Sequence, residues 1–340
     1  MHSIDKDLMR TDAYPEHPRQ VELVQTHISF VFITDDLVYK VKKPVDFGFL
    51  DFTTLEKRAH FCEREVTLNR RLAPDMYLGV VPVTDEGDRL VIGGDGKVVD
   101  HAVKMRRLPM DLLMKTVLEK GRLDVAAMGR VARRIADFHA TAERSSDIDG
   151  FGTSSAFRKN TDENFQQTEA FIGRTISQGT FDALRDFTDD FYNAHEHVFA
   201  RRVKEGRTRD CHGDLHMEHV LLTEPVVVFD CIEFNDRFRY SDTAADIAFL
   251  AMDLDFHGRT DLSKALMDAY VGASKDNGVM DVLDFYKVYR AYVRGKVNGF
   301  RLNDPHISKV DKEKAANIAG SYFKLAEGYI GRKKAGGKGR

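Results

Sequence analysis

Two acidic side chains separated by a short apolar stretch are the residues of this sequence best suited to chemistry. Asp214 lies in the run Cys211-His212-Gly213-Asp214-Leu215-His216-Met217-Glu218-His219, and Asp230 ends the strand-like Val226-Val227-Val228-Phe229-Asp230. A carboxylate in the first position could take a proton from a hydroxyl group, and one in the second could hold a metal ion. Together these two carboxylates could supply the catalytic base and the metal ligand that phosphoryl transfer requires.

The elements before this motif predict a β-rich region with one helix. Five stretches read as strands: 28–34, 37–43, 80–83, 89–92 and 98–105. A helix is expected over 54–72, with Thr53 and Glu56 as its capping box. The segment Gly93-Gly94-Asp95-Gly96 predicts a hairpin turn.

From about residue 108 the apolar period becomes helical. Seven segments predict helices: 125–142, 164–172, 180–203, 243–254, 262–271, 282–300 and 312–330. A strand-like interruption at 220–229 lies beside the acidic motif. We therefore predict an α+β fold with a β-rich N-terminal lobe over 1–107, a mainly helical lobe over 108–330, and a basic disordered tail over 331–340.

The composition indicates a folded protein without a strong charge field. The 340 residues are 42% hydrophobic and 31% charged, and the formal net charge of −3 gives no global attraction for nucleic acid. The odd count of three cysteines argues against a disulfide framework. No apolar segment reaches the roughly 18 residues of a membrane span, and the N-terminus lacks an apolar stretch of the signal-peptide kind. A cytoplasmic protein without membrane contact is expected.

A lysine and a glutamate of the N-terminal region are predicted to pair. Glu65 falls inside the apolar arc of the predicted helix, whereas Glu63 falls outside it. A carboxylate turned toward the core is costly unless it is paired. Lys40 and Lys42 share one face of their strand, and we favour Lys40 because it lies centrally. A lysine held in this way can present its ammonium group to nucleotide phosphates; the alternative is that both lysines only solubilise an exposed sheet face.

With these residues in place, the chain resembles the aminoglycoside phosphotransferase family of the protein-kinase-like superfamily. The most specific matches are His212-Gly213-Asp214-Leu215-His216, Phe229-Asp230-Cys231-Ile232-Glu233 and Tyr240-Ser241-Asp242-Thr243-Ala244-Ala245-Asp246-Ile247-Ala248. The segment Lys40-Val41-Lys42-Lys43-Pro44-Val45-Asp46-Phe47-Gly48-Phe49-Leu50-Asp51-Phe52 resembles an uncharacterised bacterial subgroup. Some members of that subgroup carry an additional P-loop kinase domain, whose signature this sequence lacks.

The resemblance implies a two-lobed kinase-like fold with ATP or GTP in the cleft between the lobes and Mg²⁺ or Mn²⁺ as cofactor. Asp214 would deprotonate the acceptor hydroxyl, and Asp230 would hold the metal ion with Glu233 close by. Lys40 would contact the phosphates while Glu65 positions it. Asp246 of the third match is expected to cap a helix and brace the catalytic loop rather than to do chemistry.

The resemblance also assigns residues around the base and the phosphates. The connector Met105-Arg106-Arg107-Leu108 would hydrogen-bond the adenine edge through its backbone groups. The loop over the phosphates lacks glycine, so a looser grip through the hydroxyls of Thr26 and Ser29 is expected. His219 replaces the asparagine that usually ligates metal five residues after the catalytic aspartate, and imidazole suits Mn²⁺, Co²⁺ or Zn²⁺ better than Mg²⁺.

Helices after the metal motif are expected to build the acceptor site. In the helix 282–300, Arg290 and Arg294 lie four residues apart and could grip an acidic or phosphorylated acceptor, with a solvated helix face as the alternative. The expected function is transfer of the nucleotide γ-phosphate to a hydroxyl of a small molecule. The sequence neither names the acceptor, nor chooses between ATP and GTP, nor sets the oligomeric state.

Two other functions stay open at this point. His212, His216 and His219 with the two acids could build a transition-metal hydrolase site, although this leaves the lysine–glutamate pair unexplained. His219 in the metal position favours a pseudokinase that binds nucleotide without transferring phosphate. A protein kinase is less well supported, because no activation-loop segment with an Ala-Pro-Glu ending follows Asp230.

Overall fold

In the computed structural model, which describes residues 2–304 and 307–336, the chain divides into two units. The first joins Met1–Lys120 to His219–Asp236, and the second joins Gly121–Glu218 to Arg237–Arg340. The segment that carries Asp230 therefore groups with the N-terminal unit. The sequence predicts a boundary near residue 107, whereas the first unit also includes the segment from His219 to Asp236.

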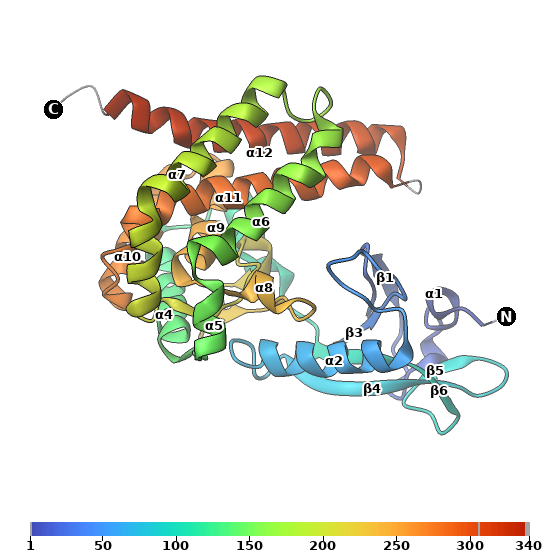
Figure 1. Cartoon of the computed structure of the whole chain (residues 1–340). Coiled ribbons are helices and arrows are strands. Elements are labelled where there is room, and N and C mark those ends of the chain that lie inside the picture. The colour runs from blue at the N-terminus through green and yellow to red at the C-terminus, as the bar shows by residue number, and fades with distance from the viewer. Residues whose placement is uncertain (1, 305–306, 337–340) are drawn as a thin grey trace. The chain divides into compact units, whose positions relative to one another are not determined.

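A six-stranded antiparallel sheet forms most of the first unit (Figure 1). Its strands are β1 (Glu22–Gln25), β2 (Ser29–Ile33), β3 (Leu37–Lys42), β4 (Tyr77–Asp85), β5 (Leu90–Ile92) and β6 (Lys97–Arg106), in the order β1-β2-β3-β6-β4-β5. The register places Lys40 between Val31 of β2 and Val103 of β6, in the interior of the sheet. β1 is the one strand of the six that the sequence did not predict.

The two faces of β3 have different neighbours. Tyr39 and Val41 pack into an apolar cluster on one face, together with the short helix α1 (Ile4–Asp7) and the segment after it. Alternation turns Lys40 and Lys42 to the other face. That face is covered by α2 (Leu55–Asn69), which lies along the sheet in Figure 1.

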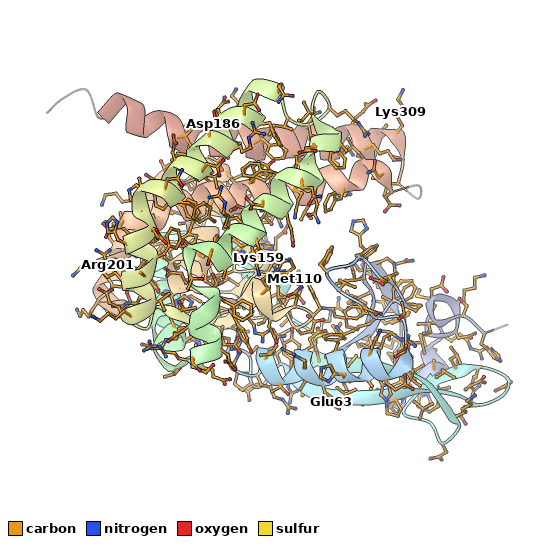
Figure 2. The ribbon with its side chains drawn as sticks, viewed as in Figure 1. Glu63, Met110, Lys159, Asp186, Arg201 and Lys309 are labelled. Carbon is orange, nitrogen blue, oxygen red and sulfur yellow. The ribbon has the colours of Figure 1, made fainter. Side chains whose placement is uncertain are left out.

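Helix α2 begins one residue later than its predicted capping box. Thr54 is the N-cap, and its hydroxyl accepts a hydrogen bond from the backbone N–H of Lys57 at 3.3 Å. Thr53 instead donates its hydroxyl to Asp51 at 2.6 Å. Glu63, labelled on α2 in Figure 2, is exposed, as its place outside the apolar arc predicted.

The predicted hairpin at Gly93–Gly96 is wrong. The segment joins β5 to β6, but these strands do not pair with each other, because β4 lies between them and pairs with both. Because both strands are antiparallel to β4, β5 and β6 run in the same direction, whereas a hairpin joins two antiparallel strands.

The predicted strand at 220–229 is a small hairpin in the first unit. It consists of β8 (Val220–Leu221) and β9 (Val227–Val228), and Asp230 lies two residues after the end of β9. The hairpin is held to the segment that contains α3 (Met114–Glu119), because the N–H of Leu222 donates to the carbonyl of Leu112 at 2.9 Å.

The second unit is helical. Its long helices are α4 (Val125–Thr141), α6 (Ser154–Thr168), α7 (Gln178–Lys204), α9 (Thr243–Phe256), α10 (Thr260–Ser274), α11 (Val279–Phe300) and α12 (Lys309–Gly336), with the shorter α5 (Ser146–Phe151) and α8 (Asp236–Arg239). Two short strands, β7 (Thr208–Asp210) and β10 (Tyr240–Asp242), pair beside them.

Helix α9 is the centre of this unit, because almost every residue along it is buried. Phe249 and Met252 of α9 share an apolar cluster with Tyr292 of α11 and Phe323 of α12. Figure 1 shows α11 and α12 running side by side. Helix α12 continues through Gly336 into the predicted basic tail, whose last four residues lie outside the described residues. Within the described ranges, no helix is both long enough and apolar enough to cross a membrane.

Candidate active site

Glu65 of α2 meets two lysines of β3. Its Oε1 lies 2.9 Å from the Nζ of Lys40, and its Oε2 lies 2.6 Å from the Nζ of Lys42. The side chains of Glu65 and Lys42 are sealed from solvent, whereas that of Lys40 is 13% exposed. The sequence favoured Lys40 as the partner; the structure adds Lys42.

The lysines decide the charge state of this buried carboxylate. Burial alone would raise the pKa of Glu65, but the ammonium groups of Lys40 and Lys42 outweigh it and hold that pKa below its usual value. Burial alone would likewise lower the pKa of Lys40. Asp230, followed by Glu65, outweighs this effect and raises the pKa of Lys40 well above its usual value. Glu65 and Lys40 are therefore both charged near neutral pH.

Asp230 is the second partner of Lys40. Its Oδ1 lies 2.7 Å from the Nζ of Lys40, and its Oδ2 lies 3.4 Å from the Nε2 of His219. The residue has a φ of 62°, a left-handed conformation that non-glycine residues rarely adopt, and its N–H donates to the hydroxyl of Tyr77 at 3.2 Å. Such an outlier is often found at functional sites, where the surrounding structure imposes it.

Glu233, predicted near the metal, forms an ion pair with Lys42. Its side chain is only 5% exposed, and burial raises the pKa of Glu233 in spite of that lysine. The Glu233 carboxylate is therefore buried and paired with Lys42, and its role beside the metal ion stays a prediction.

Asp230 is the acid of the first unit that best fits a divalent cation. Its side chain is 40% exposed, whereas those of Glu65 and Glu233 are buried. Hard cations such as Mg²⁺ and Ca²⁺ prefer carboxylate oxygens, and the neighbouring imidazole of His219 is a ligand better suited to Mn²⁺. The donor set therefore fits one divalent ion held by Asp230, with His219 as an additional ligand.

The predicted phosphate loop contains one buried hydroxyl that lacks a partner. Thr26 closes the turn before β2, because its hydroxyl oxygen accepts the N–H of Ser29 at 2.9 Å. Ser29 itself is fully buried opposite Lys42, and its hydroxyl has no hydrogen-bond partner among the described residues. An unsatisfied buried hydroxyl costs about 1–3 kcal/mol. Ser29, like Lys42 opposite it, is sealed from solvent, and its role as a phosphate contact stays a prediction.

The connector after β6 is occupied by protein contacts. Met105 is buried in the cluster under α2. The N–H of Arg107 donates to the carbonyl of Asp36 at 2.8 Å, and its guanidinium donates to the carbonyl of Thr34 at 2.9 Å. The backbone N–H of Arg107 is therefore used within the protein, and the adenine contact of this connector stays a prediction.

The loop that carries Asp214 belongs to the second unit and is held by its backbone. One oxygen of Asp246 accepts the N–H of His212, and the other accepts that of Gly213, each at 2.9 Å. Gly213 has a φ of 85°, which glycine adopts without strain. The side chain of Asp214 is 35% exposed, with its Oδ2 3.5 Å from the Nε2 of His216. The backbone is therefore fixed while the carboxylate stays accessible.

Arg290 also holds the backbone of the loop that carries Asp214. Its Nη1 donates to the carbonyl of Gly213 at 2.8 Å and its Nε to that of Ala245 at 2.9 Å, and the residue is buried. We had predicted Arg290 as an acceptor contact. The geometry instead assigns its guanidinium to the backbone beside Asp214. Helix spacing placed the residue on the correct helix but could not show whether its head group meets a ligand or a carbonyl.

Arg294 lies one turn further along α11 than Arg290 and is more exposed than that residue. Its side chain is 24% exposed, its Nη2 lies 3.7 Å from Glu218, and its Nε has no hydrogen-bond partner in the described part of the chain. Burial alone would lower the pKa of Arg294, but Tyr322 and Asp214 outweigh it and raise that pKa above its usual value. Arg294 therefore places a positive charge within electrostatic reach of Asp214.

The contribution of Asp246, which holds the backbone of this loop, can be tested by the pH dependence of the protein's stability. Burial alone would raise the pKa of Asp246, but the hydrogen bond and charge of His139 outweigh it and hold that pKa well below its usual value. The stabilisation is therefore fully present above about pH 4, the unfolded-state pKa, and is lost as the pH falls through the folded-state pKa. We expect Asp246→Asn to lower the free energy of unfolding at pH 7 by about 3 kcal/mol. Urea unfolding between pH 7 and pH 3 measures the difference, and a difference that does not shrink in acid contradicts this account.

Comparisons with known proteins give the family and the fold. Residues 59–286 match the sequence model described as the phosphotransferase enzyme family. An uncharacterized protein of Mycobacterium tuberculosis is 35% identical over 295 residues, which cover 86% of this chain and 57% of that protein. An uncharacterized protein of Mycobacterium bovis matches with the same values. The chain thus spans little more than half the length of these relatives.

Solved structures share the fold at low identity. Aminoglycoside 2′-phosphotransferase-IIIa, in a GDP complex, gives a TM-score of 0.53 at 13% identity, covering 95% of this chain and 99% of that one. A choline/ethanolamine kinase family protein from Mesorhizobium loti gives 0.52 at 14%, covering 96% and 98%. An ethanolamine kinase from Plasmodium vivax gives 0.52 at 12%, covering 90% and 81%. The predicted α+β, protein-kinase-like fold is confirmed.

Proposed function

Because this chain belongs to the phosphotransferase enzyme family, we propose that it transfers the γ-phosphoryl group of ATP or GTP to a hydroxyl of a small-molecule acceptor. The observation that carries the proposal is the position of the Lys40 ammonium, 2.9 Å from Glu65 and 2.7 Å from Asp230. A lysine oriented by a helix carboxylate and adjoining a metal-binding aspartate is the arrangement that kinases use to hold a metal–triphosphate complex.

In this proposal the first unit binds the nucleotide phosphates. Lys40, the partly exposed lysine of the pair, contacts them, and Glu65 orients it. Asp230, with His219, holds a divalent ion, which when bound neutralises negative charge on the phosphates.

Asp214 is proposed as the catalytic base. It accepts the proton of the acceptor hydroxyl while that oxygen bonds to the γ-phosphorus. The bond from this phosphorus to the β,γ-bridging oxygen breaks, and the nucleoside diphosphate leaves. Two features support this role: the carboxylate is 35% exposed, and Asp246 and Arg290 hold the backbone beside it.

A pseudokinase is the second candidate, favoured by one observation. The imidazole of His219 occupies the position expected for a metal-binding asparagine and lies 3.4 Å from Asp230. A site that disfavours Mg²⁺ in this way would bind nucleotide without turnover. His212 and His216 each accept a backbone N–H within their own loop through Nδ1 at 3.3 Å.

A metabolite-library screen for nucleotide consumption tests the proposal. The protein is assayed with ATP and with GTP, in Mg²⁺ and in Mn²⁺, and the Asp214→Asn variant serves as the blank. Consumption that depends on one acceptor class and vanishes in the blank is the expected result. Nucleotide binding without consumption in any condition would favour the pseudokinase.

Arg294 is the proposed contact for an acidic or phosphorylated acceptor. Because a hydrogen bond to a charged group contributes about 1.5–3 kcal/mol, we expect Arg294→Ala to raise the acceptor KM roughly 10- to 100-fold and to leave nucleotide affinity unchanged. Steady-state kinetics with each substrate varied in turn measure both values, with the exposed Arg185→Ala of α7 as the control. An unchanged acceptor KM would remove Arg294 from the acceptor site.

A further inference from the structure

The segment His219–Asp236, here called the metal loop, is attached to the first unit along its length after Asp230. Backbone and side-chain hydrogen bonds join it to α2 and its flanks: Cys231 N–H to Asn69 Oδ1 at 2.8 Å, Arg71 Nη2 to Cys231 Sγ at 3.2 Å, Asn235 Nδ2 to the Phe49 carbonyl at 3.0 Å, and Arg64 to Asp236. The loop therefore belongs structurally with α2. This explains why it groups with the N-terminal unit although it lies more than a hundred residues further along the chain.

Lys42 forms the buried link of this attachment. Its ammonium group pairs with Glu65 of α2 at 2.6 Å and with Glu233 of the metal loop, and it lies 4.9 Å from the centroid of the Phe52 ring. The side chain of Lys42 has no exposed surface. It cannot reach a phosphate in this arrangement, so the two lysines of β3 have different neighbours and different access to solvent.

The cost of this link argues that it does more than stabilise the fold. Removing a lysine and a glutamate from water costs several kilocalories per mole for each ion, and an apolar pair of similar volume often gives equal or greater stability. Buried ionic groups that are kept despite this cost are best attested as devices that set register. Here the register in question is that of Asp230, three residues before Glu233, relative to Lys40.

We propose that Lys42 is a positioning residue: by pairing with Glu65 and Glu233 at once, it holds the metal loop against α2 so that Asp230 is oriented for the metal ion before nucleotide binds. This inference rests on the proposed function only in taking Asp230 as the metal ligand. Lys40 contacts the phosphates; Lys42 contacts neither metal nor nucleotide and acts through the loop.

The consequence is a loss of metal affinity when the link is cut. Residues that orient metal ligands from outside the first coordination sphere typically change metal affinity by about 10- to 100-fold when they are mutated. A residue that only stabilised the fold would lower the unfolding midpoint and leave metal affinity unchanged in the molecules that remain folded. The two roles therefore differ in a measurement that requires no acceptor and no turnover.

The test is Mn²⁺ binding to the full chain in the presence of ADP, followed by electron paramagnetic resonance of free Mn²⁺. Glu233→Gln keeps the shape of the side chain and removes the ion pair, so it is the primary variant, with Lys42→Met as the second. Lys57→Met is the matched control, because it removes another lysine–carboxylate pair of the first unit, that with Asp51, whose side chains are 45% and 39% exposed.

We expect Glu233→Gln to weaken Mn²⁺ binding about tenfold or more and Lys57→Met to leave it unchanged. The double variant Lys42→Met/Glu233→Gln is expected to bind Mn²⁺ about as weakly as Lys42→Met alone, because both changes cut one link. A folded Glu233→Gln protein with wild-type Mn²⁺ affinity would overturn the inference, as would a wild-type protein that binds no Mn²⁺ with ADP. Mn²⁺ binding that depends on Glu233, in a protein that phosphorylates no acceptor, would support the positioning role and count against the proposed transfer.

Discussion

Asp214→Asn is expected to reduce phosphoryl transfer by about 10²- to 10⁴-fold, the usual contribution of a general base, with the fold intact. The amide has the shape of the carboxylate but cannot accept the proton of an acceptor hydroxyl. The carboxylate is partly exposed, and the backbone before it is held by Asp246 and Arg290. The substitution should therefore remove the base without disturbing the loop.

Single-turnover transfer with saturating nucleotide measures this effect, and nucleotide affinity and urea unfolding are recorded for the same protein. Asp268→Asn, which changes an exposed carboxylate of α10 in the same unit, is the control. Nucleotide affinity and unfolding midpoint should match the wild type in both variants. An Asp214→Asn protein that keeps more than a tenth of the wild-type rate would exclude Asp214 as the base.

Asp230→Asn is expected to have a comparable effect for a different reason. A neutral amide is a weaker ligand for a hard cation than a carboxylate, and losing one electrostatic contribution to the transition state typically costs about 10²- to 10³-fold in rate. The same substitution leaves Lys40 with Glu65 as its remaining carboxylate partner among these residues. Metal affinity should fall, whereas affinity for nucleotide in the absence of metal should be retained.

Transfer rates measured against Mg²⁺ and Mn²⁺ concentration separate these quantities. The wild type should saturate with metal, and Asp230→Asn should require far more metal and reach a lower rate. His219→Asn provides a matched comparison, because it restores the side chain expected at this position and should lower the Mg²⁺ concentration needed for half-maximal rate. If Asp230→Asn saturates at the wild-type metal concentration, Asp230 is not the metal ligand.

The fold was predictable from the sequence because its signals are local. Short apolar stretches on either side of a turn predicted β2 and β3. An apolar arc of helical period, together with a capping box, predicted α2. β1 was missed because its residues are mostly exposed and carry little alternating pattern. The Gly-rich segment after β5 predicted a hairpin, but β5 and β6 each pair with β4 and not with each other, and the Gly-rich pattern does not indicate which strand a segment pairs with.

The sequence indicated the acidic residues of the candidate site, but it indicated less well which residues they pair with. Periodicity indicated that Glu65 needs a cation and that two lysines were available, but a sequence pattern contains no distances, so the choice of one lysine missed the second. The engagement of Glu233 by Lys42 and of the Arg107 N–H by Asp36 also depends on contacts between segments far apart in sequence. No local signal reports such contacts.

The most direct test of the account follows the γ-phosphate itself by ³¹P nuclear magnetic resonance, in the presence of the acceptor class found in the screen. The account predicts a phosphate-monoester resonance on that acceptor, formed as nucleoside diphosphate appears, and absent when either Asp214 or Asp230 is replaced by asparagine. Release of inorganic phosphate alone, or the same monoester formed by the Asp214→Asn protein, would contradict it.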